Sequence, residues 1–350
     1  MIIKEQKNKI VYSDGEATES RMLDIALEYP EDRAEELIAD NSSYTLNNTF
    51  SSVRKNILNW YSFNNDADIL EVGAGMGAIT GMLCDKAKSV TAIEMSEARA
   101  NVIRARYSER QNLEVISEDI NFWKTKKRFD YVVFIGVLEY AAVFSSHKRP
   151  YDEFLSSVKR LLKKGGKVLF AIENRFGLKY WLGAAEDHLQ MPFVGINGYV
   201  QKNTPRTFSR KELEEILERV GLKNHRFYCV LPDYKFPELI FSDEYTPDYM
   251  NLKKVSFTYA SNSSLYGDEK MLYKDIIQNG TFPFFANSFL VEASEEQLNQ
   301  RHVTHVSAKG EVHKEFRVST IIDNMQNVYK VPMHKEAESH IARIVENTKS

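Results

Sequence analysis

The sequence predicts an α/β protein with a doubly wound, mostly parallel sheet and helices on both faces. The apolar run 69–72 ends in a glycine-rich turn, Gly73-x-Gly75-x-Gly77, and a helical pattern follows at once. Apolar runs and helical patterns then alternate through the first half of the chain, which is typical of successive βαβ units. The run 129–135 is apolar almost throughout, as expected of a strand that helices cover on both faces.

Strands are expected where short apolar runs lie between turn-forming residues. The expected strands are residues 69–72, 89–93, 113–116, 129–135, 167–172, 227–231 and 288–293. Near the C-terminus, residues 316–322 and 327–331 are separated by a polar turn and are expected to form a hairpin.

Helices are expected where apolar residues recur every three or four positions. Pro30 should stop the first helix, and Ser51 or Ser52 can cap a later one. Ser209 and Glu212 have the spacing of a capping box. The expected helices are residues 16–29, 31–40, 51–60, 79–87, 97–107, 154–162, 209–220, 270–278 and 335–347.

These elements divide the chain into three expected parts. Residues 1–50 form an N-terminal helical and flap segment, and residues 51–294 form the main ligand-binding domain. Residues 295–350 form a hairpin and a helix, which bury too little surface to fold alone. This C-terminal part either packs on the main domain or begins a further domain.

Irregular stretches near the expected site are candidates for its cover. The turn-rich residues 41–49 are either a flap over the glycine turn or a plain connector. Residues 174–207 and 232–285 are long insertions rich in aromatic residues, and we expect them to act as a substrate lid.

The composition argues against several classes of function. The 46 basic and 49 acidic residues leave a net charge of −3, which offers no electrostatic footprint for nucleic acid. The sequence shows neither an apolar run of membrane-spanning length nor a secretory signal. Cys84 and Cys229 lie outside any metal-binding or redox pattern. We therefore expect a soluble cytoplasmic protein with reduced thiols, no metal site and no nucleic-acid partner.

Three acidic residues discriminate between the ligands that a glycine-rich turn can hold. Glu71 suits a ligand with ammonium and sulfonium charges, whereas it would repel a pyrophosphate. Glu94 ends the next strand and can accept hydrogen bonds from both ribose hydroxyls. Asp119 follows the third strand, where it can accept the exocyclic amine of an adenine. The same turn also fits a dinucleotide fingerprint, so a nicotinamide-dependent oxidoreductase is an alternative.

These residues, together with Phe129-Asp130 and the stretch 136–140, resemble the class I S-adenosylmethionine-dependent methyltransferases over residues 51–171. The resemblance implies a seven-stranded Rossmann-like sheet, S-adenosylmethionine as cofactor and S-adenosylhomocysteine as product. It also implies cofactor-binding roles for Glu71, Gly73, Ala74, Gly75 and Gly77 at the methionine part, Glu94 and Met95 at the ribose, Asp119 and Ile120 at the adenine, and Gly136 and Leu138 near the sulfonium.

A finer resemblance lies downstream of these strands. Residues 171–180, 183–188, 206–210 and 231–235 are similar to methyltransferases associated with bacterial cell-surface polysaccharide synthesis. Some of those proteins continue into a kinase-like domain. The resemblance therefore implies a glycan-assembly partner and a possible start of such a domain at the C-terminus.

A kinase upper lobe pairs a strand lysine with a helix glutamate. Lys330 with Glu336 or Glu338 could form this pair. Kinase activity of this chain is excluded, because the sequence has neither a glycine-rich phosphate loop before the pair nor a catalytic loop after it.

The expected reaction is O-methylation of a sugar or phosphosugar. His188 is the first candidate for the general base, with Glu186 or Asp187 to orient it, and Glu139 is the second candidate. The aromatic residues that could stack on a sugar ring are Phe176, Tyr180 and Trp181. The remaining alternative is a non-catalytic module that regulates or scaffolds a glycan-assembly partner.

Overall fold

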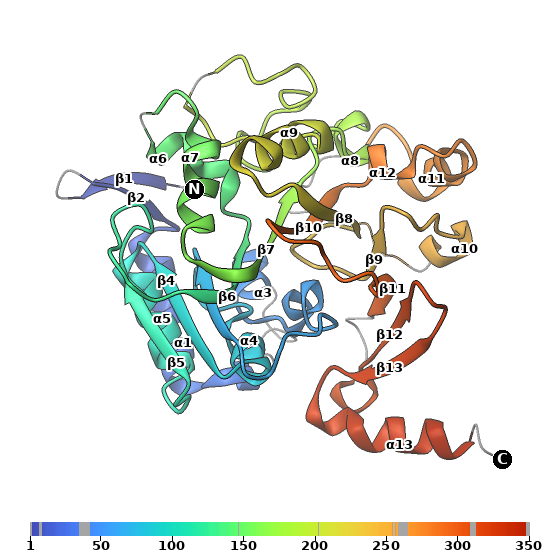
Figure 1. Cartoon of the computed structure of the whole chain (residues 1–350), viewed down its shortest axis with the longest axis horizontal. Coiled ribbons are helices and arrows are strands. Elements are labelled where there is room, and N and C mark those ends of the chain that lie inside the picture. Colours follow the sequence, from blue (N-terminus) through green and yellow to red (C-terminus); the bar gives the residue numbers. More distant parts are fainter. Residues whose placement is uncertain are drawn as a thin grey trace.

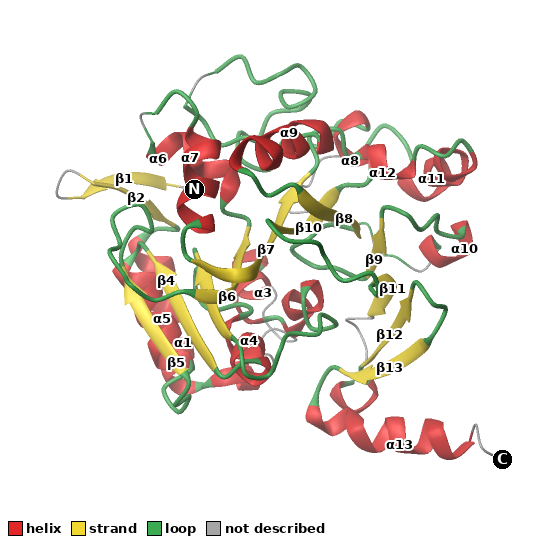
Figure 2. Ribbon diagram, viewed as in Figure 1, coloured by secondary structure: helices red, strands yellow, loops and turns green. Residues whose placement is uncertain are grey.

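The computed structural model describes residues 2–347, apart from residues 7–8, 35–42, 146, 202, 254, 256, 258–264 and 309–312. The described chain forms an eleven-stranded mixed sheet with helices on both faces, and a separate N-terminal hairpin of β1 (Ile2–Gln6) and β2 (Lys9–Ser13) (Figures 1 and 2). The predicted α/β class is therefore confirmed.

Five parallel strands make up one half of the sheet. They are β3 (Asp68–Val72), β4 (Ser89–Glu94), β5 (Leu113–Ser117), β6 (Phe129–Ile135) and β7 (Leu162–Glu173), in the order β5-β4-β3-β6-β7. Since all five strands point the same way, their carboxyl ends meet at one edge of the sheet.

Antiparallel strands make up the other half. Strand β10 (Ser288–Ser294) lies between β7 and β8 (Asn224–Leu231), and β9 (Leu239–Ser242) follows. Strands β11 (Val303–Ala308), β12 (Val318–Asp323) and β13 (Val328–Pro332) complete the sheet. The sheet thus has eleven strands instead of the expected seven.

The hairpin that was expected to be a C-terminal appendage extends this main sheet. Strand β12 pairs with β11, which pairs with β9, so the hairpin continues the ladder (Figure 1). Lys330 donates to Thr320 Oγ1 at 2.6 Å. Within the described part of the chain, no ion pair joins Lys330 to Glu336 or Glu338, so the expected kinase-like pair is not formed.

Two layers of helices enclose the sheet. Helices α4 (Thr80–Lys86) and α5 (Glu97–Arg106) cover one face, where Met82, Leu83 and Ile103 are buried. Helices α7 (Pro150–Lys159) and α9 (Arg210–Val220) cover the other face. The predicted capping box of α9 is present, with Gly221 at its end in a left-handed conformation. The remaining helices are α1 (Glu16–Glu28), η1 (Glu31–Ala34), α3 (Tyr44–Phe50), η2 (Ser52–Ile57), η3 (Leu138–Tyr140), α6 (Ala141–Phe144), α8 (Leu178–Trp181), α10 (Tyr249–Leu252), α11 (Glu269–Gln278), α12 (Phe282–Phe285), η4 (Lys314–Phe316), η5 (Lys335–Ala337) and α13 (Glu338–Asn347).

The segment before the sheet differs from the sequence-based expectation. Residues 44–50 form the helix α3 and not a turn, because the Ser43 hydroxyl caps its first turn by accepting from Leu46 N. The helix expected at 51–60 is the shorter 3₁₀ helix η2. Most of the helix expected at 31–40 lies outside the described residues.

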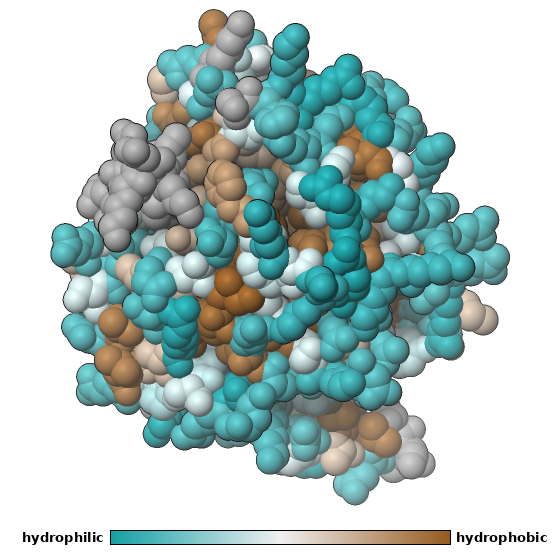
Figure 3. Space-filling view, turned by 60° about the vertical axis from the view of Figure 1, so that its left-hand side comes forward, coloured by the Kyte–Doolittle hydropathy of each residue, from teal (hydrophilic) through white to brown (hydrophobic). Residues whose placement is uncertain are grey.

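None of the helices in the described part of the chain is long and apolar enough to cross a membrane. On the face shown in Figure 3, apolar patches lie among more numerous hydrophilic side chains.

Candidate active site

A cavity of about 560 Å³ lies at the carboxyl ends of the parallel strands. Strands β3, β4 and β6 contribute Val72, Glu94 and Ile135, and the loops that follow these strands contribute more of its wall. This volume lies within the range of small-molecule and cofactor pockets, about 300–1,000 Å³.

The glycine turn after β3 needs glycine for two physical reasons. Gly73 and Gly75 have φ values of +65° and +61°, which side chains other than glycine adopt at a cost. A Cβ on Gly73 would also lie 2.6 Å from Val137 Cγ2, so the turn after β6 packs directly on this backbone. The turn therefore brings bare backbone to the cavity.

Glu94 holds the glycine turn in place. Its Oε2 accepts from Gly75 N at 2.8 Å, and its Oε1 accepts from Ser96 N at 3.0 Å. The side chain is buried and lines the cavity. Each carboxylate oxygen can accept a second hydrogen bond, so Glu94 keeps acceptor capacity toward a ligand.

Glu71 lies on β3 beneath the same turn. Its Oε2 accepts from the Thr80 hydroxyl at 2.6 Å. Burial raises the pKa of Glu71 to about 8. A cationic ligand group beside this carboxyl would favour its charged form.

Helix α3 lies over the glycine turn, within the stretch 41–49 for which the sequence left a flap and a plain connector open; residues 41 and 42 lie outside the described residues. Tyr44, Asn48 and Thr49 line the cavity. The buried Arg106 connects α3 to the turn, because its Nη1 donates to Thr49 O at 2.7 Å and to Gly77 O at 3.1 Å. This position is the one expected of a flap, and the flap role itself stays a prediction.

The structure brings most of the expected cofactor residues to one cavity. Those that line it are Glu71, Gly73, Ala74, Gly75, Glu94, Met95, Asp119, Ile120 and Gly136. Gly77 does not line it; its carbonyl accepts from Tyr107 OH at 2.8 Å, and a Cβ there would meet the Tyr107 ring. Leu138 is fully buried in the core beside the cavity. Both residues serve packing beside the cavity, and the ligand contacts expected of them stay predictions.

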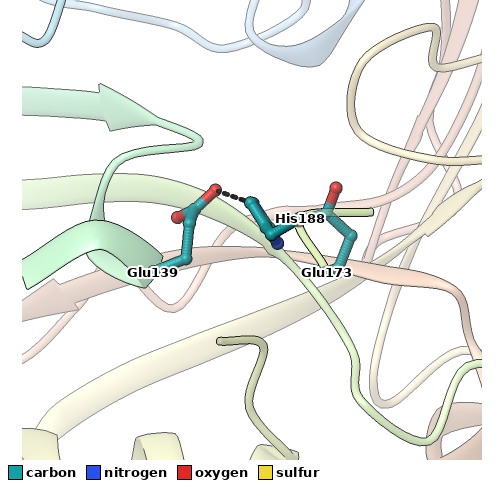
Figure 4. A group of neighbouring side chains, drawn as sticks. All are labelled: Glu139, Glu173 and His188. Atoms are coloured by element: carbon teal, nitrogen blue, oxygen red, sulfur yellow. Dashed lines mark ion pairs between the residues drawn. The ribbon is translucent and has the colours of Figure 1, made fainter. Parts of the chain in front are cut away.

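Both expected catalytic residues line the same cavity. His188 Nδ1 lies 3.0 Å from Glu186 Oε1, and its Nε2 lies 3.7 Å from Glu139 Oε1 (Figure 4). Burial opposes a charge on the ring, but the carboxylates of Glu139 and Glu186 outweigh it and raise the pKa of His188 to about 10. The structure selects Glu186, and not Asp187, as the residue that orients His188.

Asp187 belongs to an adjacent buried cluster that was not found from the sequence. Lys179 Nζ lies 2.9 Å from Asp187 Oδ2, and Lys235 Nζ lies 3.1 Å from Asp187 Oδ1. Lys235 also contacts Glu173 and Asp233. Burial would raise the pKa of Asp187, but the two lysines hold it well below its ordinary value. The residues of this cluster lie within the stretches 171–180, 183–188 and 231–235, which carry the finer family resemblance, but the sequence does not show that they contact one another.

The aromatic residues expected to stack on a sugar do not line the cavity. Tyr180 is buried and donates to Asp187. Phe176 stacks on Phe284 with ring centres 5.2 Å apart, and Trp181 donates to Phe176 O. These rings pack against their own insertion and α12, and their stacking on a sugar stays a prediction.

A family model described as a methyltransferase domain matches residues 45–226, which is more than half of the chain. The chain therefore belongs to this methyltransferase family. The expectation of a methyltransferase is therefore confirmed at the level of the family, and the match does not support the oxidoreductase alternative.

Known proteins resemble parts of the chain at low identity. Ribosomal RNA small subunit methyltransferase A of Fusobacterium nucleatum is 31% identical over 75 residues, which are 21% of this chain and 28% of that protein. Ubiquinone biosynthesis O-methyltransferase of Rickettsia bellii is 28% identical over 170 residues, or 47% of this chain and 64% of that protein. The chain thus spans less than two thirds of these curated relatives. The solved DhpI–SAH complex has 18% identity and a TM-score of 0.40, covering 78% of this chain and 96% of that one.

We expect Gly73→Ala to lower the free energy of unfolding by about 2–4 kcal/mol, from a left-handed alanine and an overpacked contact with Val137. Gly280→Ala is the matched control, because Gly280 has φ +68° and no atom lies within 4 Å of the place that its Cβ would take. The free energy of unfolding of Gly280→Ala should fall by only about 1–2 kcal/mol. Urea denaturation measures both, and Val137→Ala should partly rescue Gly73→Ala. Equal losses of stability in the two glycine variants would show that a Cβ at position 73 does not collide with Val137.

Glu71 should make the protein less stable as the pH rises. The folded state keeps a proton on Glu71 up to about pH 8, whereas the unfolded chain releases it near the ordinary value of 4.5, so stability falls across this interval. Glu71→Gln should remove this part of the pH dependence, measured by urea denaturation at several pH values. Glu114 is exposed, so Glu114→Gln should leave this pH dependence of stability unchanged. The same slope in Glu71→Gln and wild type would refute the assignment.

Proposed function

We propose that the protein transfers a methyl group from S-adenosylmethionine to a hydroxyl of a sugar in bacterial surface-glycan synthesis. One observation carries the proposal: a single cavity is lined by the glycine turn and Glu94 as well as by Glu139 and His188. A cofactor and an acceptor can therefore occupy adjacent parts of one cavity, as a direct transfer requires.

The residues present fit S-adenosylmethionine. Glu71 offers a carboxyl for its ammonium group, and Glu94 has free acceptor capacity for ribose hydroxyls. Asp119 and Ile120 suit the adenine, and Gly136 lines the same cavity. A Cβ on Gly136 would lie 2.5 Å from the Tyr234 hydroxyl, so the glycine lets Tyr234 pack against the turn after β6. When bound, the cofactor supplies an activated methyl group.

Glu139 is the better candidate to accept the proton of the acceptor hydroxyl. Its Oε2 is buried without a hydrogen-bond partner among the described residues, whereas both ring nitrogens of His188 face carboxylates. Tyr234 lies nearby, with its hydroxyl 3.5 Å from Glu139 Oε1. This geometry reverses the order expected from the sequence, so that His188 positions Glu139.

The charges around Glu139 favour a neutral sugar over a phosphosugar. Glu186 and Asp187 lie close to His188, and the ammonium groups of Lys179 and Lys235 are already paired with carboxylates. A phosphate would meet this negative surface, and both lysines of the cluster are already paired with carboxylates.

The link to surface glycans rests on the sequence resemblance. The net charge argues against nucleic acid, although several relatives are named for ribosomal RNA and one for transfer RNA. Two buried free cysteines support a cytoplasmic location.

We expect Glu94→Ala to weaken binding of S-adenosylhomocysteine at least about tenfold, because it removes both the turn contact and the ribose acceptor. Glu94→Gln keeps one acceptor oxygen and should lose less. Glu97→Ala is the control, since Glu97 lies outside the cavity wall on the first turn of α5. Calorimetry measures all three, and unchanged affinity in Glu94→Ala would remove Glu94 from the cofactor site.

The acceptor class can be tested with labelled S-adenosylmethionine and fractions of bacterial cell envelope and RNA. Label should enter the glycan fraction, and Glu139→Gln should slow transfer about 10²-fold or more. Label in RNA alone would overturn the proposed acceptor, and no label in any fraction would favour the non-catalytic module.

A further inference from the structure

Three side chains from separate segments converge beside the cavity. Glu139 comes from η3 after β6, Glu173 is the last residue of β7, and His188 lies in the insertion that follows (Figure 4). One ligand atom from each lies within 4.8 Å of the other two. Atoms bound to one metal ion at about 2.0–2.3 Å have mutual distances no larger than this.

Two of the carboxylate oxygens in this group have no partner. Glu139 and Glu173 are 1% and 0% exposed, and among the described residues the Oε2 of each makes no hydrogen bond. A buried charged oxygen without a partner retains the full cost of its desolvation. A cation between the two side chains would satisfy both oxygens.

His188 is held in the orientation of a metal ligand. Nδ1 is 3.0 Å from Glu186 Oε1, and because an ionised carboxylate only accepts, Nδ1 carries the hydrogen. Nε2 then faces Glu139 at 3.7 Å, which is longer than a hydrogen bond. Histidine ligands commonly donate their other ring N–H to a carboxylate in this way.

The charges of the surrounding cluster also leave a place for a cation. Its ion pairs join five carboxylates to two lysines and His188. The excess is two negative charges with His188 protonated, and three with the neutral His188 that a metal ligand requires. The two lysines offset two of the three charges of Glu173, Asp187 and Asp233. No lysine or arginine makes an ion pair with Glu139 among the described residues.

We infer that Glu139, Glu173 and His188 bind one divalent cation that accepts both nitrogen and oxygen ligands, such as Mn²⁺ or Zn²⁺. The inferred metal site departs from the sequence-based expectation of no metal site, which rested on the absence of a metal-binding pattern around the two cysteines. The role of the ion rests on the proposed function: it would hold and polarise the acceptor oxygen. Glu139 would bind the ion through one carboxylate oxygen and accept the hydroxyl proton on the other. Its binding does not rest on that function.

The test is titration of the chelator-treated full-length protein with Mn²⁺ alone, followed by electron paramagnetic resonance of the free ion. We expect one saturable site per chain. Absence of saturable binding up to about 1 mM, the weak end of the usual affinity scale, would overturn the inference.

Variants locate the site. Glu173→Gln and Glu139→Gln should each weaken Mn²⁺ binding about 10–100-fold, as the loss of a supporting ligand does in other metal sites. Glu71→Gln is the matched control, because it removes a buried carboxyl from the same cavity at the glycine turn. It should bind Mn²⁺ as the wild type does. Equal weakening in all three variants would show a general charge effect and overturn the assignment.

A second readout does not depend on any variant folding. Pulsed electron paramagnetic resonance of Mn²⁺ bound to the wild-type protein should show coupling to an imidazole ¹⁴N, and its absence would overturn the role of His188. Methyl transfer in the presence of a chelator, without Mn²⁺ binding, would overturn the metal site and leave the proposed function standing. Saturable Mn²⁺ binding without any methyl transfer would overturn the proposed function and leave the metal site standing.

Discussion

The hydrogen bonds of one carboxylate hold the cofactor half of the site together. Glu94 ends β4, and it joins the turn after β3 to the start of α5 through Gly75 N and Ser96 N. Backbone amides in such a turn have few other partners, and unpaired buried amides are costly. The same carboxylate is placed to contact a ribose, so one side chain supports the loop and faces the ligand.

The two ends of the cavity differ in physical character. At the glycine turn, close packing and left-handed backbone leave room for a ligand, as the contact between Gly73 and Val137 shows. At the other end, charged side chains of the insertion and of the loop after β8 surround Glu139. Under the proposed function, the first end would recognise the cofactor through its shape, and the second would supply the charges that activate and select an acceptor.

The sequence predicted the parallel half of the fold because its signals are local. Apolar runs bounded by turns place β3 to β7, and Glu71 and Glu94 could be found from their spacing to the glycines. Strand β9 was missed because it has four residues within a long insertion, and β11 because Val303–Ala308 alternates polar and apolar residues without a strong apolar run. Helix α3 was missed because Asn and Thr are poor helix formers, and its Ser43 cap overrides that preference.

The charged end could be predicted only in part. His188 and Glu139 were found because each follows a strand at the expected edge of the sheet. The contacts of Lys235 with Glu173 and Asp187 join segments that are 62 and 48 residues apart, and no local pattern reports such a pairing. The sequence could therefore name the candidates but not which carboxylates are compensated by lysine and which are not.

Arg106 links helix α3, which lies over the cavity, to the glycine turn beneath it. A single guanidinium nitrogen bonds both the carbonyl of Thr49 on α3 and that of Gly77 in the glycine turn. Helix α3 cannot move away without breaking its hydrogen bond to Arg106, and the same guanidinium also holds the turn beneath the helix. Opening of the cover and loosening of the cofactor loop are thus coupled motions, and cofactor exchange should require both.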